Sequence, residues 1–144
     1  MLKLNSWLKN LFLKTKSKNS EWDNIVVGKI LNVGKHPNAD RLKVCTVDCG
    51  TETRTIVCGG SNVETGMLVV VAKPGAKVHF GGGAELEEIK ETNIRGVNSE
   101  GMMCGADELG LAERFPIKQE REIINLNNLN VKVGSSFAGV INVK

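Results

Sequence analysis

Short apolar stretches, separated by polar and glycine-bearing segments, recur along the chain from residue 25 onward. Residues 25–33 are rich in isoleucine and valine, and residues 42–47 and 54–58 have the same β-type composition. Residues 67–72 form an unbroken apolar run, which predicts a well-buried strand. Weaker signals predict further short strands at residues 77–80, 85–94, 102–104, 123–126 and 131–143.

The segments between these stretches carry turn residues. Residues 48–53 and 59–66 contain glycines and predict a hairpin turn and a loop, and residues 73–75 (Lys-Pro-Gly) have the composition of a tight turn. Residues 81–83 are three consecutive glycines, and residues 106–112 fit one or two helical turns. Because no long helix separates the strands, we expect an all-β protein built as a small, closed or nearly closed β-barrel.

The N-terminal segment has a different pattern. Residues 1–14 place apolar side chains at helical spacing and predict a short amphipathic helix, which should dock on the body, on a partner or on an anionic surface. Residues 15–24 are largely polar and predict a linker. The expected organisation is a helix, a linker and one β domain over residues 25–144, which ends in a C-terminal strand extension.

Charge is unevenly distributed along the chain. Residues 1–20 carry five lysines and no acid, residues 25–80 have a net charge of +3, and residues 85–122 have a net charge of −5. Aromatic residues make up only 4% of the chain and tyrosine is absent, which leaves few surfaces for base stacking. A nucleic acid would therefore be bound through one face, helped by the basic N-terminal segment.

The sequence offers no convincing active site. Its four cysteines lack C-x-x-C spacing and, with only two histidines, they predict buried reduced thiols instead of a zinc site. No phosphate-binding loop or nucleophile elbow is present, so we expect no cofactor, no metal and no catalysis by the isolated chain. No apolar run is long enough for a membrane span and no secretory signal is evident, so the cytoplasm is the expected location.

Several motifs together resemble one known family. The motifs are VVGKI (residues 26–30), KHPNADRLKVC (35–45), IVCG (56–59), PGA (74–76) and RGVNSEGM (95–102). In this order and spacing they are similar to the tRNA-binding OB-fold (EMAP II-like) family, and most of all to the N-terminal region of the bacterial phenylalanyl-tRNA synthetase β subunit. The resemblance implies an OB-fold-like Greek-key β-barrel with short helical appendages that binds tRNA.

The chain also departs from that β subunit. Little more than the linker separates the Trp-Leu-Lys opening at residues 7–9 from the first barrel strand, and only one domain follows. Residues 58–62 read CGGSN where the family has CGAPN. Residues 85–91 carry four glutamates in a strand that is usually basic, which weakens the expectation of strong tRNA affinity more than that of the fold.

The candidate RNA-binding residues divide into two groups. Basic side chains would contact phosphates, with Arg able to do so through two hydrogen bonds and Lys acting as a point charge; they are Lys29, Lys35, Arg41, Lys43, Arg54, Lys73, Lys77 and Arg95. Polar side chains would read sugar hydroxyls or unpaired base edges; they are His36, Asn38, Asn62, Ser99 and Glu100. We expect weak, salt-sensitive binding that depends on shape and charge.

Three functions remain open from the sequence. The chain could be a module that binds tRNA in trans or as a synthetase accessory, with or without self-association. It could be a truncated or partial phenylalanyl-tRNA synthetase β subunit that acts in aminoacylation with a catalytic α partner. It could also be a protein-interaction domain that does not bind RNA, which the acidic residues 85–122 favour.

Overall fold

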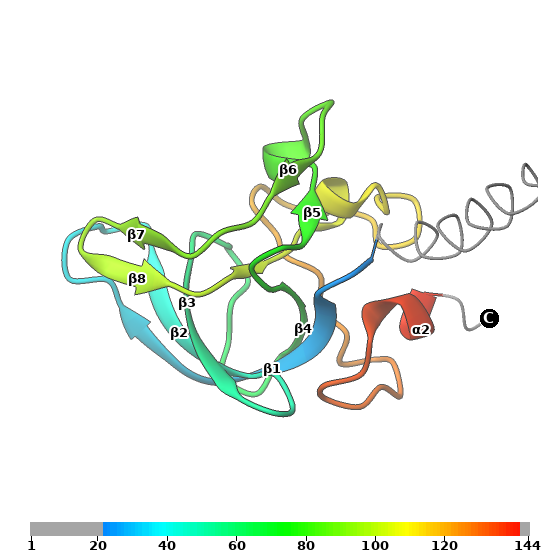
Figure 1. The fold of residues 1–144 in the computed structure, drawn as a ribbon, viewed down its shortest axis with the longest axis horizontal. Coiled ribbons are helices and arrows are strands. Elements are labelled where there is room, and N and C mark those ends of the chain that lie inside the picture. The colour runs from blue at the N-terminus through cyan, green and yellow to red at the C-terminus, as the bar shows by residue number, and fades with distance from the viewer. Residues whose placement is uncertain (1–21, 142–144) are drawn as a thin grey trace, which may run out of the picture.

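A computed structural model describes residues 22–141 of the protein (Figure 1). The predicted N-terminal helix at residues 1–14 and most of the predicted linker lie outside the described residues. No helix within residues 22–141 is both long and apolar enough to cross a membrane.

The described residues form nine strands and three short helical segments. The strands are β1 (Ile25–Lys35), β2 (Lys43–Asp48), β3 (Thr53–Cys58), β4 (Leu68–Ala72), β5 (Lys77–Val78), β6 (Glu87–Glu88), β7 (Thr92–Ile94), β8 (Val97–Ser99) and β9 (Met102–Met103). The helical segments are the 3-10 turns η1 (Phe80–Gly82) and η2 (Ala106–Leu109) and the helix α2 (Phe137–Ile141).

Five strands form one antiparallel sheet in the order β3-β2-β1-β4-β9. The first half of β1 pairs with β4 and the second half pairs with β2, and the register shifts between Ile30 and Asn32. A shift of this kind bends a strand, and the bend lets β1 belong to both sides of a curved sheet. Two-stranded pairs of β5 with β6 and of β7 with β8 complete the strands.

Hydrogen bonds between β3 and the β8–β9 segment close the sheet into a barrel. Val57 N–H donates to Ser99 Oγ (3.0 Å), and Glu100 N–H donates to Thr55 O (2.7 Å). The side chain of Glu100 accepts the Thr55 N–H in return (2.9 Å). This closure, with little helix, confirms the prediction of an all-β, OB-fold-like barrel.

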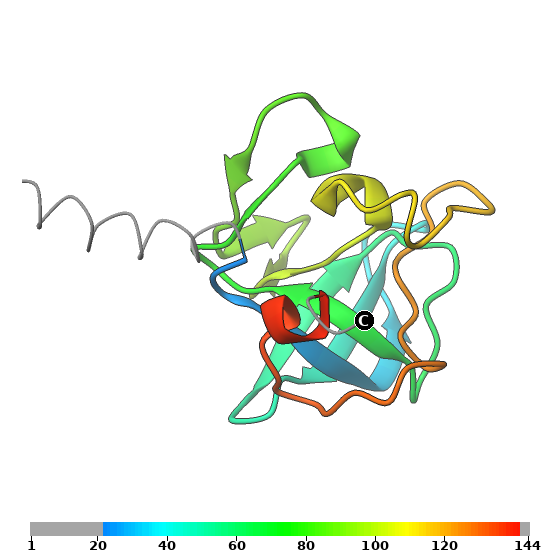
Figure 2. The same ribbon diagram turned by 90° about the vertical axis from the view of Figure 1, so that its right-hand side faces the viewer.

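Strand β4 is buried on both faces, as its unbroken apolar run predicted. Val69 and Val71 face the barrel interior, whereas Val70 belongs to a second apolar cluster with Leu126 and Phe137. Figure 2 shows α2, which carries Phe137, in front of β1 and β4. Full burial of an aliphatic or aromatic side chain contributes about 1.5–3 kcal/mol, so this second cluster stabilises the barrel from outside.

The two ends of the described chain differ from the predictions. Trp22, in the predicted linker, packs edge-on against Phe137 with ring centroids 5.7 Å apart, so the linker ends in a core contact. The strands predicted at residues 123–126 and 131–143 are wrong for the residues described: one isolated bridge at Ser136 and the helix α2 take their place. The C-terminal segment packs on the barrel through scattered backbone hydrogen bonds, which the apolar pattern alone cannot distinguish from strand pairing.

The segment between β4 and β8 is more broken than predicted. The turn predicted at residues 73–75 is confirmed: Ala76 N–H closes it by donating to Lys73 O (2.9 Å), and Gly75 has φ +101°. The strands predicted at residues 77–80 and 85–94 shorten to β5, β6 and β7. The 3-10 turn η1 takes the last residue of the first of these, Phe80, and two residues of the glycine loop predicted at 81–83. The helical turn predicted at 106–112 is present as η2.

Candidate nucleic-acid interface

The loop between β1 and β2, residues 36–42, is attached to the β7–β8 hairpin by the buried side chain of His36. Its Nε2 lies 2.9 Å from Ile94 O, and its Nδ1 accepts the N–H of Asn38 (2.9 Å). An acceptor at Nδ1 requires the neutral ring with its proton on Nε2, which then donates to Ile94. His36 therefore joins two loops that lie 58 residues apart in the chain.

Asn38 and Arg95 reinforce this attachment. Asn38 Nδ2 donates to Arg95 O (2.9 Å), and Arg95 Nη1 donates to Asn38 O (3.3 Å). Arg95 and Gly96 have φ +52° and +101°, so they form the two-residue, left-handed turn that suits an antiparallel hairpin. The loop and the hairpin lie side by side at the left of Figure 1.

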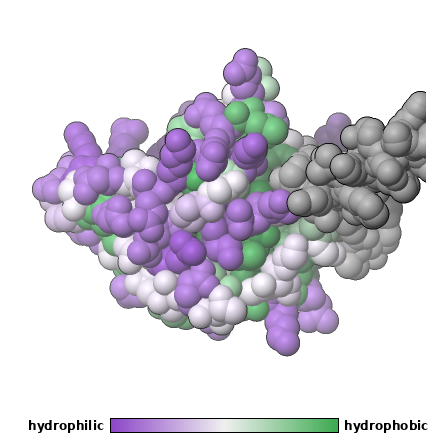
Figure 3. Space-filling model, in the orientation of Figure 1, coloured by the Kyte–Doolittle hydropathy of each residue, from purple (hydrophilic) through white to green (hydrophobic). Residues whose placement is uncertain are grey.

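Three exposed cations lie along the base of this loop. Lys35 and Lys43 are directly opposite each other in the β1–β2 register, and Arg41 precedes Lys43 in the chain. Directly opposed like charges repel, so an anion between them would be favourable. We call Lys35, Asn38, Arg41, Lys43 and Arg95 the basic loop face; the end of the molecule that holds this loop and hairpin is mostly hydrophilic in Figure 3.

Three other predicted residues lie on the seam that closes the barrel. The buried Ser99 hydroxyl accepts the Val57 N–H and donates to Gly101 O (3.1 Å). Arg54 forms a salt bridge with Glu52 (2.8 Å) and also donates to Glu100 O (3.1 Å). These groups are already occupied by contacts within the chain.

Asn62 lies outside the basic loop face. Its amide donates to Ile123 O and accepts the Ile123 N–H, both at 2.9 Å, in the manner of a paired strand. The remaining predicted lysines are dispersed over the strands: Lys29 lies opposite Asp48 in β1, Lys73 follows β4, and Lys77 lies opposite Glu88 in β5.

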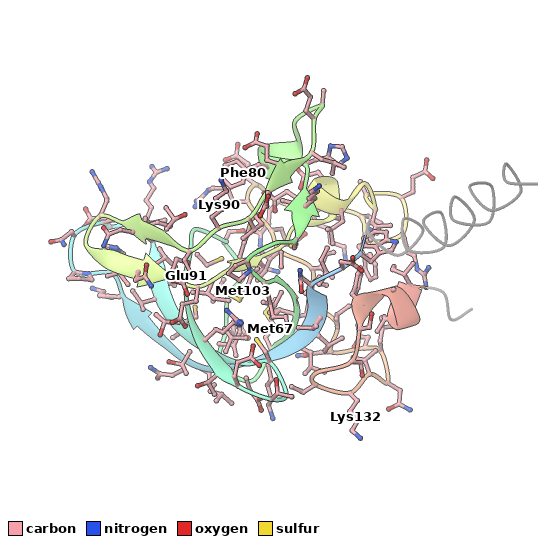
Figure 4. The ribbon with its side chains drawn as sticks, viewed as in Figure 1. Met67, Phe80, Lys90, Glu91, Met103 and Lys132 are labelled. Atoms are coloured by element: carbon pink, nitrogen blue, oxygen red, sulfur yellow. The ribbon has the colours of Figure 1, made fainter. Side chains whose placement is uncertain are left out.

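A cleft of about 640 Å³ lies next to the hairpin, between the end of β3, the β6–β7 segment and η2. Its lining includes Phe80, Lys90, Met103 and Arg121, none of which was predicted as a site residue. Figure 4 shows Phe80 and Lys90 near β6. The one sequence signal was an aromatic residue directly before three glycines, in a chain with few aromatic residues.

The four thiols do not form a reactive site. All four cysteines are buried and free, as predicted. Burial raises the pKa of Cys45 and Cys49 to about 11, and it also raises the pKa values of Cys58 and Cys104. These groups are therefore protonated near neutral pH and poor as nucleophiles or metal ligands. Within residues 22–141, no three His, Cys, Asp or Glu side chains come together as a metal site.

Solved structures of other proteins show the same fold. The C-terminal domain of Plasmodium vivax p43 matches with a TM-score of 0.50 and 24% identity, covering 81% of this chain and 59% of that one. A MetRS-related protein from Pyrococcus horikoshii matches with a TM-score of 0.50 and 20% identity, covering 77% and 85%. At these identities the likeness concerns the fold alone.

Curated relatives give a more specific result. The phenylalanine–tRNA ligase β subunit of Chlorobaculum tepidum is 54% identical over 90 residues, covering 62% of this chain and 11% of the relative. That of Chlamydia pneumoniae is 46% identical over 102 residues, covering 71% and 12%. The matched region thus spans about a tenth of these relatives.

A family model described as a putative tRNA-binding domain matches residues 25–136, more than half of the chain. The chain therefore belongs to the family of putative tRNA-binding domains, which confirms the resemblance found in the sequence.

Proposed function

We propose that the chain binds tRNA and that the basic loop face contacts its phosphates. The observation that carries this proposal is the cross-strand pair of Lys35 and Lys43, with Arg41 beside it on an exposed loop. Opposed lysines destabilise each other in the free protein, and a phosphate placed between them removes this repulsion. Family membership and the curated relatives support tRNA as the anion.

The fixed geometry of the loop favours binding. The hydrogen bonds of His36 and Asn38 hold the loop against the hairpin before any ligand arrives, so less conformational entropy is lost on binding. In an OB-fold, oligonucleotides bind over the second and third strands and the loops at their ends. On this proposal His36 and Asn38 position the cations, because their side chains already bond to the protein.

The test is a fluorescence-anisotropy titration of bulk tRNA at low and physiological salt. We expect R41A/K43A to weaken binding about tenfold at physiological salt and to reduce the slope of log affinity against log salt by about 1.4. The control K118A/K132A removes the same charge from exposed positions outside the basic loop face. Equal losses in both variants would show only nonspecific charge attraction, and no binding even at low salt would refute the proposal.

A second candidate places the chain within an enzyme. The identity of 54% to a phenylalanine–tRNA ligase β subunit favours a partial β subunit that acts with a catalytic α subunit. Light scattering after size exclusion, with the chain alone and mixed with an α subunit, tests this candidate and self-association together. A mixed peak at the summed mass supports an enzyme partner, a heavier peak of the chain alone supports self-association, and a monomer in both samples contradicts both.

A further inference from the structure

The cleft beside the basic loop face offers a different chemistry from the face itself. We propose that it receives one unpaired base of the bound RNA, which stacks on Phe80 while its phosphate stays outside near Lys90 and Arg121. This inference rests on the proposed function and adds to it a subsite for a nucleobase. Four observations on the described residues carry it.

The first observation is the exposure of Phe80. Its side chain is 57% exposed on η1, at the edge of the cleft. Within residues 22–141 the other aromatic residues, Trp22, Phe115 and Phe137, are buried or half-buried, so Phe80 alone offers an open ring face. Stacking of a base on such a ring is a recurrent mode of single-strand recognition.

The second observation is that the loop carrying Phe80 is held in place. Gly81 N–H donates to Glu108 Oε2 (3.0 Å), and His79 N–H donates to Glu108 O (2.8 Å). The other carboxylate oxygen of Glu108 accepts Gly105 N–H (2.8 Å). The exposed ring is therefore presented by a preorganised turn, which lowers the entropic cost of stacking.

The third observation is the lining of the cleft. Buried Met103 and Ile123 contribute apolar surface. A volume of about 640 Å³ lies within the range of sites that hold small molecules, roughly 300–1,000 Å³. Four further carboxylates line the cleft and would repel a phosphate, so the group that enters is a neutral base; they are Glu87, Glu88, Asp107 and Glu122.

The fourth observation is the continuity of the cleft with the basic loop face. Thr92 and Ile94 line the cleft, and the next residue of the same hairpin, Arg95, belongs to the basic loop face. Lys90 and Arg121 are exposed residues of the cleft lining, and Arg121 Nη1 donates to Gly59 O (2.7 Å). Their charges can still attract the phosphate of the inserted nucleotide at the rim of the cleft. An RNA strand on the basic loop face can therefore place a neighbouring base against Phe80.

The experiment compares F80A with L86A in the full chain, using bulk tRNA at physiological salt. Leu86 is 52% exposed on the same segment but does not line the cleft, so it is a matched control for lost apolar surface. We expect F80A to weaken binding about tenfold with little change in the salt slope, because the substitution removes no cation. F80W should restore binding, and L86A should bind within twofold of the unmodified chain.

Further outcomes separate the two proposals. If tRNA binding depends on Arg41 and Lys43 but F80A and L86A bind equally well, the base subsite is refuted and the proposed function stands. If the unmodified chain does not bind tRNA, both fail. A fully paired RNA duplex has no base to insert, so F80A should bind it as the unmodified chain does; an equal loss on duplex and tRNA would overturn the subsite. Thermal melts of both variants should coincide, since each removes an exposed side chain.

Discussion

Two loops of this barrel are fastened to remote backbone by an asparagine side chain. Asn38, in the loop of residues 36–42, bonds to Arg95, 57 residues away. Asn62, in the loop of residues 59–67, bonds to Ile123, 61 residues away. The two loops follow β1 and β3, and each joins the barrel to a segment from the second half of the chain.

The two anchors differ in burial and in number of bonds. Asn62 satisfies both the N–H and the carbonyl of Ile123, which is only 6% exposed. Asn38 bonds one carbonyl of the exposed Arg95 and lies among exposed cations. Because unsatisfied buried backbone groups are costly, the first anchor contributes mainly to stability. The second mainly holds a charged surface in place.

The largest expected effect follows from N62A. It leaves the N–H and carbonyl of buried Ile123 without their partner, and each such group costs about 1–3 kcal/mol. We expect the free energy of unfolding in urea to fall by about 3 kcal/mol, with tRNA affinity unchanged for the folded protein. N130A, at an exposed position, is the control. A loss below about 1 kcal/mol would mean that water replaces both hydrogen bonds.

The hairpin turn under the basic loop face gives the next effect. Gly96 has φ +101°, and a Cβ there would lie 3.3 Å from Asn38 Nδ2. A left-handed conformation costs a non-glycine residue about 1–2 kcal/mol, so G96A should lower stability by that amount. It should also weaken tRNA binding severalfold, because it displaces Asn38. G66A is the control: Gly66 also has a positive φ, but a Cβ at that position would have no atom within 4 Å, and affinity should persist. An unchanged affinity for tRNA in G96A would show that the geometry of this turn does not affect binding at the basic loop face.

N38A should have a smaller effect on stability and a clear effect on binding. The hydrogen bond from the Asn38 side chain to Arg95 O is exposed to water, so we expect its loss to lower the free energy of unfolding by about 0.5–1 kcal/mol. Binding should weaken severalfold with an unchanged salt slope, because the cations remain but are less fixed. Titration of tRNA at two salt concentrations measures this. If N62A bound tRNA more weakly than N38A, Asn62 and not Asn38 would be the asparagine that holds the binding surface in place.

The sequence predicted the barrel better than its anchors. The strands β1 to β4 follow from local composition, since an apolar run or alternation reflects burial directly. The residues of the basic loop face were predicted because the motif at residues 35–45 places most of them next to one another in the chain. In contrast, the bond between Asn62 and Ile123 spans 61 residues, and no local pattern indicates that an exposed-looking amide mimics a strand.

The C-terminal segment and the cleft near Phe80 were also not predicted correctly, because both depend on contacts between residues that are distant in sequence. The C-terminal residues around Phe137 are apolar because they cover β4, and this burial predicts strand or helix equally well. The cleft near Phe80 is formed by segments from β3, β6 and η2 that are distant in sequence, so only the folded chain brings its lining together. Sequence reasoning thus identified residues that act as local neighbours and missed those that depend on long-range contacts.

The smallest expected effect concerns Cys58, the thiol beside the loop that Asn62 holds. Cys58 is 7% exposed and its Sγ accepts Gly60 N–H at 3.3 Å, so opening of the loop of residues 59–67 should make it more accessible to a reagent. Burial raises its pKa, which keeps the closed form protonated and unreactive at neutral pH. N38A should change the rate of Cys58 alkylation at pH 7.5 by less than about twofold, measured by mass spectrometry of the labelled peptides, because its anchor lies on the other loop.

N62A supplies the positive control for this measurement, because loss of its two bonds to Ile123 makes opening of the loop easier and should accelerate labelling at Cys58 well before the barrel unfolds. Cys45, buried within β2, should keep its slow rate in both variants, since its exposure requires opening of the sheet. Acceleration at Cys58 by N38A as large as that by N62A would show that the two loops open together, and the division between a stabilising anchor and a positioning anchor would then fail.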